Sequence, residues 1–135
     1  MDSTLSGELY WLTLTVLMTS LFWVPYIVNR MLERGVFTAL WDPQGVTDTN
    51  RNWASRMMRA HKNAVENLVI FAPLVICVEL MKLNSSVTAG ACIVYFFARL
   101  THYVTFTLGV PLLRVVAFLV GFAAQFTLAL TLLGI

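Results

Sequence analysis

Residues 56–78 read RMMRAHKNAVENLVIFAPLVICV, a polar stripe that leads directly into a hydrophobic segment. Four polar residues recur at i, i+3, i+7 and i+10: Arg56, Arg59, Asn63 and Glu66. This spacing places them on one face of a helix with 3.6 residues per turn. The residues from 68 to 78 are nearly all apolar. The stretch therefore predicts a membrane-crossing helix that begins with a functional polar face.

The composition of the whole chain supports a membrane protein. Of its 135 residues, 59% are hydrophobic and 12% are charged, whereas soluble domains carry about 25% charged residues. The long apolar runs favour transmembrane helices, and the short alternating segments of a transmembrane barrel are missing from the sequence. A net charge of +2 is too small to suggest binding to nucleic acid.

Four apolar segments predict a single domain, residues 1–135, that forms an antiparallel four-helix bundle. We expect the helices at about 6–34, 53–81, 86–107 and 112–133. Residues 36–50 have the Pro, Gly and Asp content of a loop. Pro25 and Pro73 are expected to bend their helices. Thr49, Asn50 or Asn52 is expected to cap the second helix.

Lysine and arginine residues predict the orientation of the bundle. Arg30, Arg34, Arg51 and Arg56 flank the first loop, and Arg114 follows the third turn, whereas the other side keeps only Lys82. Positive loops stay in the cytoplasm, so both termini are expected outside. The first ten residues lack a positive region, so we expect no cleaved signal peptide. Cys77 and Cys92 lie in apolar runs and are expected to be buried, with no metal site.

Charged residues inside the predicted spans need partners. An arginine or acid near the centre of a lipid-facing helix costs about 2.5–3.5 kcal/mol. We therefore expect Glu66 to pair with Arg59 or Arg99. One interpretation is an ion-pair network that only holds the bundle together. The other is a cationic pocket for a ligand with carboxylates or a phosphate. That pocket would comprise Arg30, Arg56, Arg59, Arg99 and Arg114, with Asn63 as a bidentate amide and His102 as a proton donor or acceptor.

Three motifs resemble the family of membrane-associated proteins in eicosanoid and glutathione metabolism, MAPEG. The first is RxxRAHxNxxE, here Arg56 to Glu66, which opens the second of the four helices in that family. The second is Arg99-x-x-His102, and the third is Pro111 followed by Arg114. The resemblance covers nearly the whole chain. It suggests a microsomal glutathione transferase-like protein of a bacterial inner membrane.

The resemblance implies a homotrimer with glutathione, as co-substrate, bound between subunits near the cytoplasmic face. The implied glutathione-binding residues are Arg30, Arg56, Arg59, Asn63, Glu66, Arg99 and His102. Arg114 is the implied catalytic residue, because the family associates its fourth-helix arginine with stabilisation of the thiolate. The expected activity is transfer of glutathione to a hydrophobic electrophile, or glutathione-dependent reduction of a peroxide, at the bilayer.

The chain departs from the eicosanoid-type members at three positions. Val115 and Phe118 stand where those members have Ser and Tyr, and Phe106 stands where they have another Tyr. These differences argue against a prostaglandin or leukotriene synthase. One alternative function is a non-catalytic member that binds a lipid or a partner protein. Another is a small proton-coupled exporter with Glu66 as its carrier. Neighbouring arginines would oppose that role, because they would keep Glu66 ionised.

Overall fold

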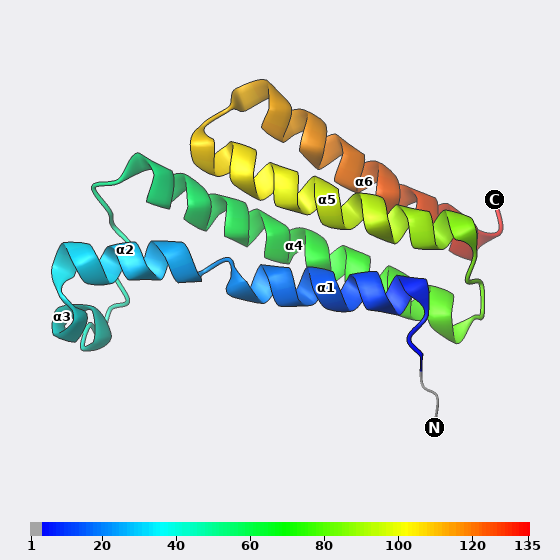
Figure 1. Cartoon of the computed structure of the whole chain (residues 1–135), viewed down its shortest axis with the longest axis horizontal. Helices are drawn as coiled ribbons and strands as arrows, with labels where there is room; N and C mark the ends of the chain where they lie inside the picture. Colours follow the sequence, from blue (N-terminus) through cyan, green and yellow to red (C-terminus); the bar gives the residue numbers. More distant parts are fainter. Residues whose placement is uncertain (1–3) are drawn as a thin grey trace.

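The computed structural model describes residues 4–135, which form helices and no strands (Figure 1). The helices are α1 (Gly7–Leu21), α2 (Val24–Arg34), α3 (Val36–Leu40), α4 (Asn52–Leu80), α5 (Ser86–Leu108) and α6 (Pro111–Leu133). Four stretches are long and apolar enough to cross a membrane: α1 with α2 (28 residues), α4 (29), α5 (23) and α6 (23). The predicted all-α, four-span membrane fold is confirmed.

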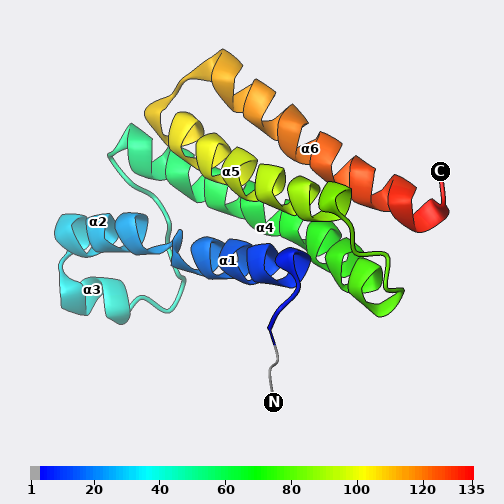
Figure 2. The ribbon, with the colours of Figure 1, turned by 45° about the vertical axis from the view of Figure 1, so that its right-hand side comes forward.

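The spans run antiparallel and bring distant segments to a shared end. In two views, α2, α3, the start of α4 and the α5–α6 turn lie at one end, whereas the start of α1 and the end of α6 lie at the other (Figures 1 and 2). We call the first of these the arginine end, because Arg30, Arg34, Arg51, Arg56, Arg59 and Arg114 all lie in its segments. The predicted clustering of positive charge thus appears in three dimensions.

The first span is interrupted between α1 and α2, one turn before the position expected from Pro25. Proline has no N–H to bond the carbonyl of residue i−4, and its ring clashes with that carbonyl. The helix therefore breaks at Phe22 and Trp23, and Pro25 lies in the first turn of α2. The hydroxyl of Tyr103 donates a 2.8 Å hydrogen bond to the carbonyl oxygen of Phe22. Their rings also stack, with centroids 3.7 Å apart. By contrast, α4 continues as one helix across Pro73.

Two expectations for the first loop are wrong. Its first five residues form α3 rather than irregular structure. The cap of α4 is Arg51, with no side-chain hydrogen bond, so neither Asn50 nor Asn52 caps this helix. Thr49 acts one step earlier, because its hydroxyl accepts a hydrogen bond from the N–H of Arg51 while donating to Glu33. The Thr49 hydroxyl thus stabilises the residues that precede α4 rather than the first turn of that helix.

The core lies where α4 and α5 cross the other spans. Phe71 and Tyr95 stack at 3.7 Å in the half distant from the arginine end, and small residues of α4, among them Ala60 and Ala64, allow close packing in the other half. Cys92 is buried as expected. The prediction for Cys77 is wrong, because it is exposed on the outer surface of the single chain.

A buried acid joins α1 to α5 at the end opposite the arginines. Glu8 is 2% exposed, and its Oε1 accepts hydrogen bonds from the Thr88 hydroxyl and from the N–H of Ser85. Ser85 and Thr88 also cap α5 reciprocally. A carboxylate is favourable here, because unpaired N–H groups and the helix dipole make the start of a helix positive. Sequence analysis did not identify Glu8.

We predict that Glu8→Ala lowers the apparent melting temperature of the purified protein. The substitution leaves the Ser85 N–H without its charged acceptor, and a hydrogen bond to a charged group contributes about 1.5–3 kcal/mol. Glu8→Gln keeps an acceptor of the same shape, so it should lie between the two. A melting temperature of Glu8→Ala equal to that of the wild type would show that this contact is not stabilising.

Candidate functional site

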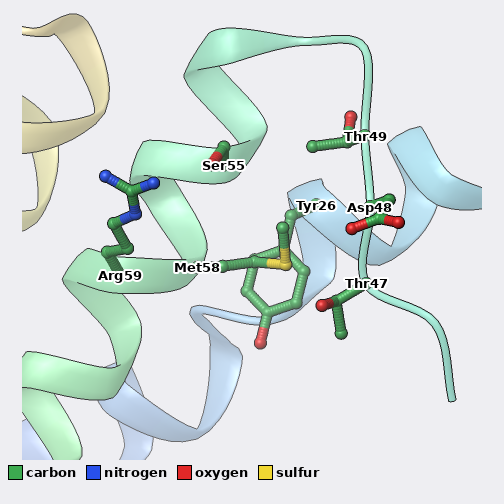
Figure 3. Close-up of a pocket in the computed structure, with 7 residues that line it drawn as sticks. All are labelled: Tyr26, Thr47, Asp48, Thr49, Ser55, Met58 and Arg59. Carbon is green, nitrogen blue, oxygen red and sulfur yellow. The ribbon is translucent and has the colours of Figure 1, made fainter.

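A groove runs along α4 where it faces α2 and the first loop. Its outer part, about 610 Å³, is lined by Tyr26, Thr47, Asp48, Thr49, Ser55, Met58 and Arg59 (Figure 3). Its inner part, about 430 Å³, is lined by Tyr26, Met58, His61, Lys62, Val65 and Glu66. The two parts adjoin, because Tyr26 and Met58 line both. We call the whole the α4 groove.

One edge of the polar stripe opens into the α4 groove. Arg59 lines its outer part and Glu66 its inner part, and both side chains are exposed in the single chain. The predicted pairing of Glu66 with Arg59 or Arg99 is wrong within residues 4–135. Its one charged partner there is Lys62, with Nζ and Oε1 4.0 Å apart. Within the described residues, arginines therefore do not surround Glu66, and the argument against a proton carrier loses that support.

The other edge of the stripe packs against α5. Arg56 donates from Nε to the carbonyl oxygen of Thr107, at 2.9 Å. Its guanidinium lies beside Gly109, where a Cβ would come within 3.3 Å of it. Gly109 has φ +79°, a conformation that glycine adopts without strain. Arg56 thus joins α4 to the α5–α6 turn.

Arg99 lies inside the helix bundle of the single chain rather than on its surface. It is 2% exposed, and Nη1 donates to Oδ1 of Asn63 at 3.0 Å. The guanidinium carbon lies 5.5 Å from the ring centroid of Phe118 and 5.9 Å from that of Tyr95. Its Nε and Nη2 are buried without a hydrogen-bond partner in the described chain. Direct contact with a surface ligand, as implied by the resemblance, does not fit this burial.

His102 and Arg114 share an aromatic setting near the arginine end. His102 is 4% exposed and packs between Phe106 and Phe118, at 5.5 and 6.2 Å between ring centroids. The Arg114 guanidinium carbon lies 4.6 Å from the Phe106 centroid. Two of the three positions that depart from the eicosanoid-type pattern, Phe106 and Phe118, therefore flank the predicted histidine, and Phe106 also lies against the predicted catalytic arginine.

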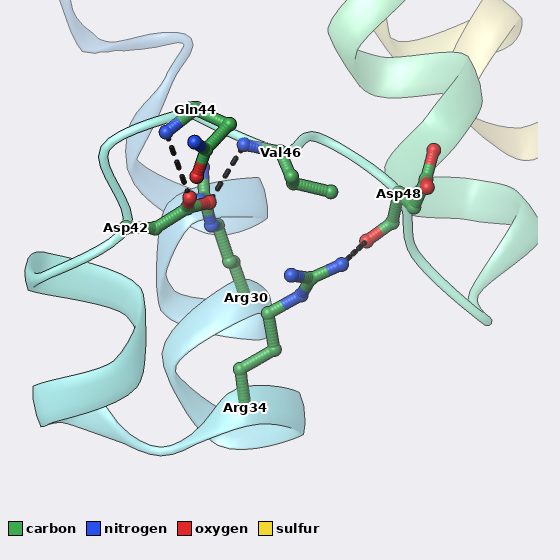
Figure 4. Close-up of polar contacts among 6 residues, drawn as sticks. All are labelled: Arg30, Arg34, Asp42, Gln44, Val46 and Asp48. Atoms are coloured by element: carbon green, nitrogen blue, oxygen red, sulfur yellow. Dashed lines mark hydrogen bonds and ion pairs between the residues drawn. The ribbon is translucent and has the colours of Figure 1, made fainter.

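Arg30 is committed to the first loop. Its Nη2 lies 2.7 Å from Oδ2 of Asp42, and the same carboxylate accepts hydrogen bonds from the N–H groups of Gln44 and Val46 (Figure 4). Arg34 adds a 3.5 Å contact to the carbonyl oxygen of Asp48. Arg30 therefore holds the fold of the loop that forms one wall of the α4 groove.

Sequence analysis missed Tyr26, which lines both parts of the groove. Its hydroxyl lies 2.8 Å from Nδ1 of His61. His61, the histidine of the RxxRAHxNxxE motif, thus has a polar partner on α2 within the same chain. The sequence contained a weak signal, since Tyr26 directly follows Pro25, which lies in the first turn of α2.

The arginine end has more positive charge than its acids neutralise. In residues 4–135 the side-chain ion pairs are Arg30–Asp42 and Lys62–Glu66. No acid therefore lies within 4.0 Å of Arg56, Arg59, Arg99 or Arg114 in this part of the chain. The described residues contain no cluster of three or more potential metal ligands. The chemistry offered is that of anion binding by guanidinium groups.

Comparison with known proteins identifies one relationship. A sequence model of the MAPEG family matches residues 9–134, nearly the full chain. Searches of curated proteins and of solved structures gave no match.

We predict that Asp42 makes the loop sensitive to acid. Hydrogen bonds from Val46 and Gln44, and the charges of Arg30 and Arg34, hold the pKa of Asp42 below its ordinary value, against the effect of partial burial. A carboxyl with a lowered pKa stabilises the fold above its ordinary pKa of about 4, and this contribution is lost as the pH falls through the lowered value. Protection of the Gln44 and Val46 amides from hydrogen exchange should follow that course.

Asp42→Asn should remove the same protection at neutral pH, because the amide carries no charge for Arg30. The amides of α5 serve as the internal control. Unchanged protection at Gln44 and Val46 in Asp42→Asn would show that the carboxylate does not hold the loop.

Proposed function

The chain belongs to the MAPEG family, and from this premise we propose that it binds glutathione at the arginine end and delivers its thiol to a hydrophobic electrophile. The observation that carries the proposal is the set of arginines without an acid partner. Glutathione has two carboxylates, one ammonium group and a thiol. Guanidinium groups recognise carboxylates through charge-assisted, often bidentate hydrogen bonds. Arg59, which is exposed in the α4 groove, and Arg56 are proposed to hold the carboxylates.

Glu66 is proposed to bind the ammonium group of glutathione. It is the acid that lines the α4 groove on the stripe, one turn from Asn63 and two from Arg59. Its side chain is 59% exposed in the single chain. A charge facing lipid at depth costs about 2.5–3.5 kcal/mol, so this surface of α4 needs cover. A neighbouring copy of the chain would provide it, as in the proposed homotrimer with glutathione bound between protomers.

Arg114 is proposed to stabilise the thiolate. A nearby guanidinium lowers the pKa of a thiol, and the thiolate is the reactive nucleophile. In the transferase reaction its sulfur forms a bond to an electrophilic carbon and the leaving group departs with its electron pair. In the reductase reaction it attacks a peroxide oxygen, the O–O bond breaks and an alcohol leaves. A second glutathione thiol then attacks the sulfenic acid that has formed, which gives the disulfide and water. An apolar groove of about 370 Å³ between α5 and α6, which includes Leu113 and Val116, offers an approach from the bilayer.

The orientation belongs to the same proposal. The positive loops favour a cytoplasmic position for the arginine end, where glutathione would enter the α4 groove from water. The second substrate would arrive laterally from the lipid. Both termini would then lie on the opposite side of the membrane.

A second candidate is a family member that binds glutathione without turnover. It is favoured by the packing of Phe106 and Phe118, which surround His102 with hydrocarbon and provide no hydroxyl beside Arg114. Binding of glutathione without measurable transfer or reduction would identify this role.

We predict that millimolar glutathione raises the melting temperature of the purified protein. A ligand at ten times its Kd stabilises the folded state by about 1.4 kcal/mol. Glu66→Ala should shrink the shift, because the ammonium group loses its counter-charge, and Glu79→Ala, at the opposite end of the bundle, controls for loss of an acid. If the wild type shows no shift at any millimolar concentration, the proposed ligand is wrong.

We predict that Arg114→Ala slows transfer of glutathione to a model electrophile by a factor on the order of 10²–10³, the usual effect of removing one group that stabilises a developing anion. Arg51→Ala, which removes an arginine from the same end outside the proposed site, should keep the rate. A rate unchanged in Arg114→Ala would exclude the catalytic role of this residue.

A further inference from the structure

The amide of Asn63 is held in one orientation by its neighbours. Its Oδ1 accepts from Nη1 of Arg99 at 3.0 Å and lies 3.4 Å from Nδ2 of Asn67. Guanidinium groups only donate hydrogen bonds, so the side facing Arg99 must be the oxygen. The nitrogen, Nδ2, is then the free side of the amide. It has no hydrogen bond within residues 4–135, and it is not among their buried unpartnered atoms.

Arg99 has little freedom to release this oxygen. It is 2% exposed, and Asn63 Oδ1 is its one side-chain hydrogen-bond acceptor in the described chain. Aromatic rings of Tyr95 and Phe118 flank it. On the remaining side Gly121 approaches so closely that a Cβ would lie 3.2 Å from Nε. Gly121 thus leaves room for the Arg99 guanidinium, and the surrounding rings and helix backbone fix the orientation of this group.

We infer that Arg99 is a positioning residue that turns the Asn63 amide so that it offers a ligand one N–H donor and no acceptor. The inference deepens the proposed function and rests on it. Asn63 lies on the stripe between Arg59 and Glu66, one turn from each. Its Nδ2 therefore selects a hydrogen-bond acceptor of glutathione, a carboxylate or peptide carbonyl oxygen, and disfavours a donor. The bidentate amide expected from the sequence becomes a single donor.

Asn63→Asp separates this role from a structural one. An aspartate still accepts from Arg99 and gives the buried guanidinium a counter-charge, so the ligand-free melting temperature should equal or exceed that of the wild type. The side facing the ligand loses its donor and gains negative charge. Glutathione binding, measured by calorimetric titration, should weaken by about tenfold to a hundredfold. Binding as tight as that of the wild type would overturn the inference.

Variants at Arg99 test the positioning itself. Arg99→Leu removes the charge that fixes Asn63, and replacing a buried ion by an apolar side chain is often neutral or stabilising. We expect it to fold, to bind glutathione at least tenfold more weakly, and to raise KM more than it lowers kcat. Arg99→Lys keeps a buried donor and should restore part of the affinity. Equal affinity in Arg99→Leu and the wild type would contradict the inference, and so would a stable Arg99→Lys that binds no better than Arg99→Leu.

Two glycines provide a matched pair. Gly121→Ala places a methyl group against the Arg99 guanidinium, whereas Gly90→Ala adds one to open space on α5. The first should weaken glutathione binding and the second should not. Titration of the wild type with glutathione distinguishes failure of the proposed function from failure of the inference. No binding by the wild type refutes the proposed function, whereas wild-type binding that Asn63→Asp and Gly121→Ala leave unchanged refutes the inference alone.

Discussion

Lipid supplies neither a hydrogen-bond partner nor a counter-ion, and this constraint governs the arrangement of polar groups in the protein. Within the spans, threonine hydroxyls donate to carbonyls one turn earlier, as Thr15 does to Trp11 and Thr105 to Thr101. At the break in the first span, a tyrosine hydroxyl from another helix donates a hydrogen bond to the buried carbonyl oxygen of Phe22. At the ends, acids bond helix termini and loops. Buried side-chain atoms without a hydrogen-bond partner are therefore unusual, and in the described residues most of them belong to arginines.

The acids of this chain are used mainly as structural ties. Glu8 joins α1 to α5, Glu79 bonds Ser6 and Asn84, and Asp42 folds the first loop around Arg30. Because these carboxylates bond other groups, the arginines on α4 and α6 are left without an acid that neutralises their charge. Glu8 and Glu79 fasten the end of the bundle opposite the arginines, whereas at the arginine end Asp42 ties only Arg30 and the loop, and Arg56, Arg59 and Arg114 have no acid within 4.0 Å in the described residues. This separation connects the fold to the proposed glutathione site.

Periodicity and hydrophobicity sufficed to predict the fold, because lipid strongly limits the possible structures. The stripe from Arg56 to Glu66 was also placed correctly on one helical face. What the sequence could not show is how that face divides: Asn63 turns inward to Arg99, whereas Glu66 remains exposed. Such partners depend on packing between helices, and so do the Glu8 tie and the pairing of Arg30 with Asp42. Spacing along one helix contains no information about them.

The central claim is that an anionic ligand neutralises the arginine end. A high-resolution structure of the assembled protein in saturating glutathione tests it most directly. The account predicts density for glutathione in the α4 groove, with its carboxylates on Arg56 and Arg59 and its sulfur toward an Arg114. A structure in which acids of neighbouring protomers pair with these arginines, and no density for glutathione is present, would contradict it.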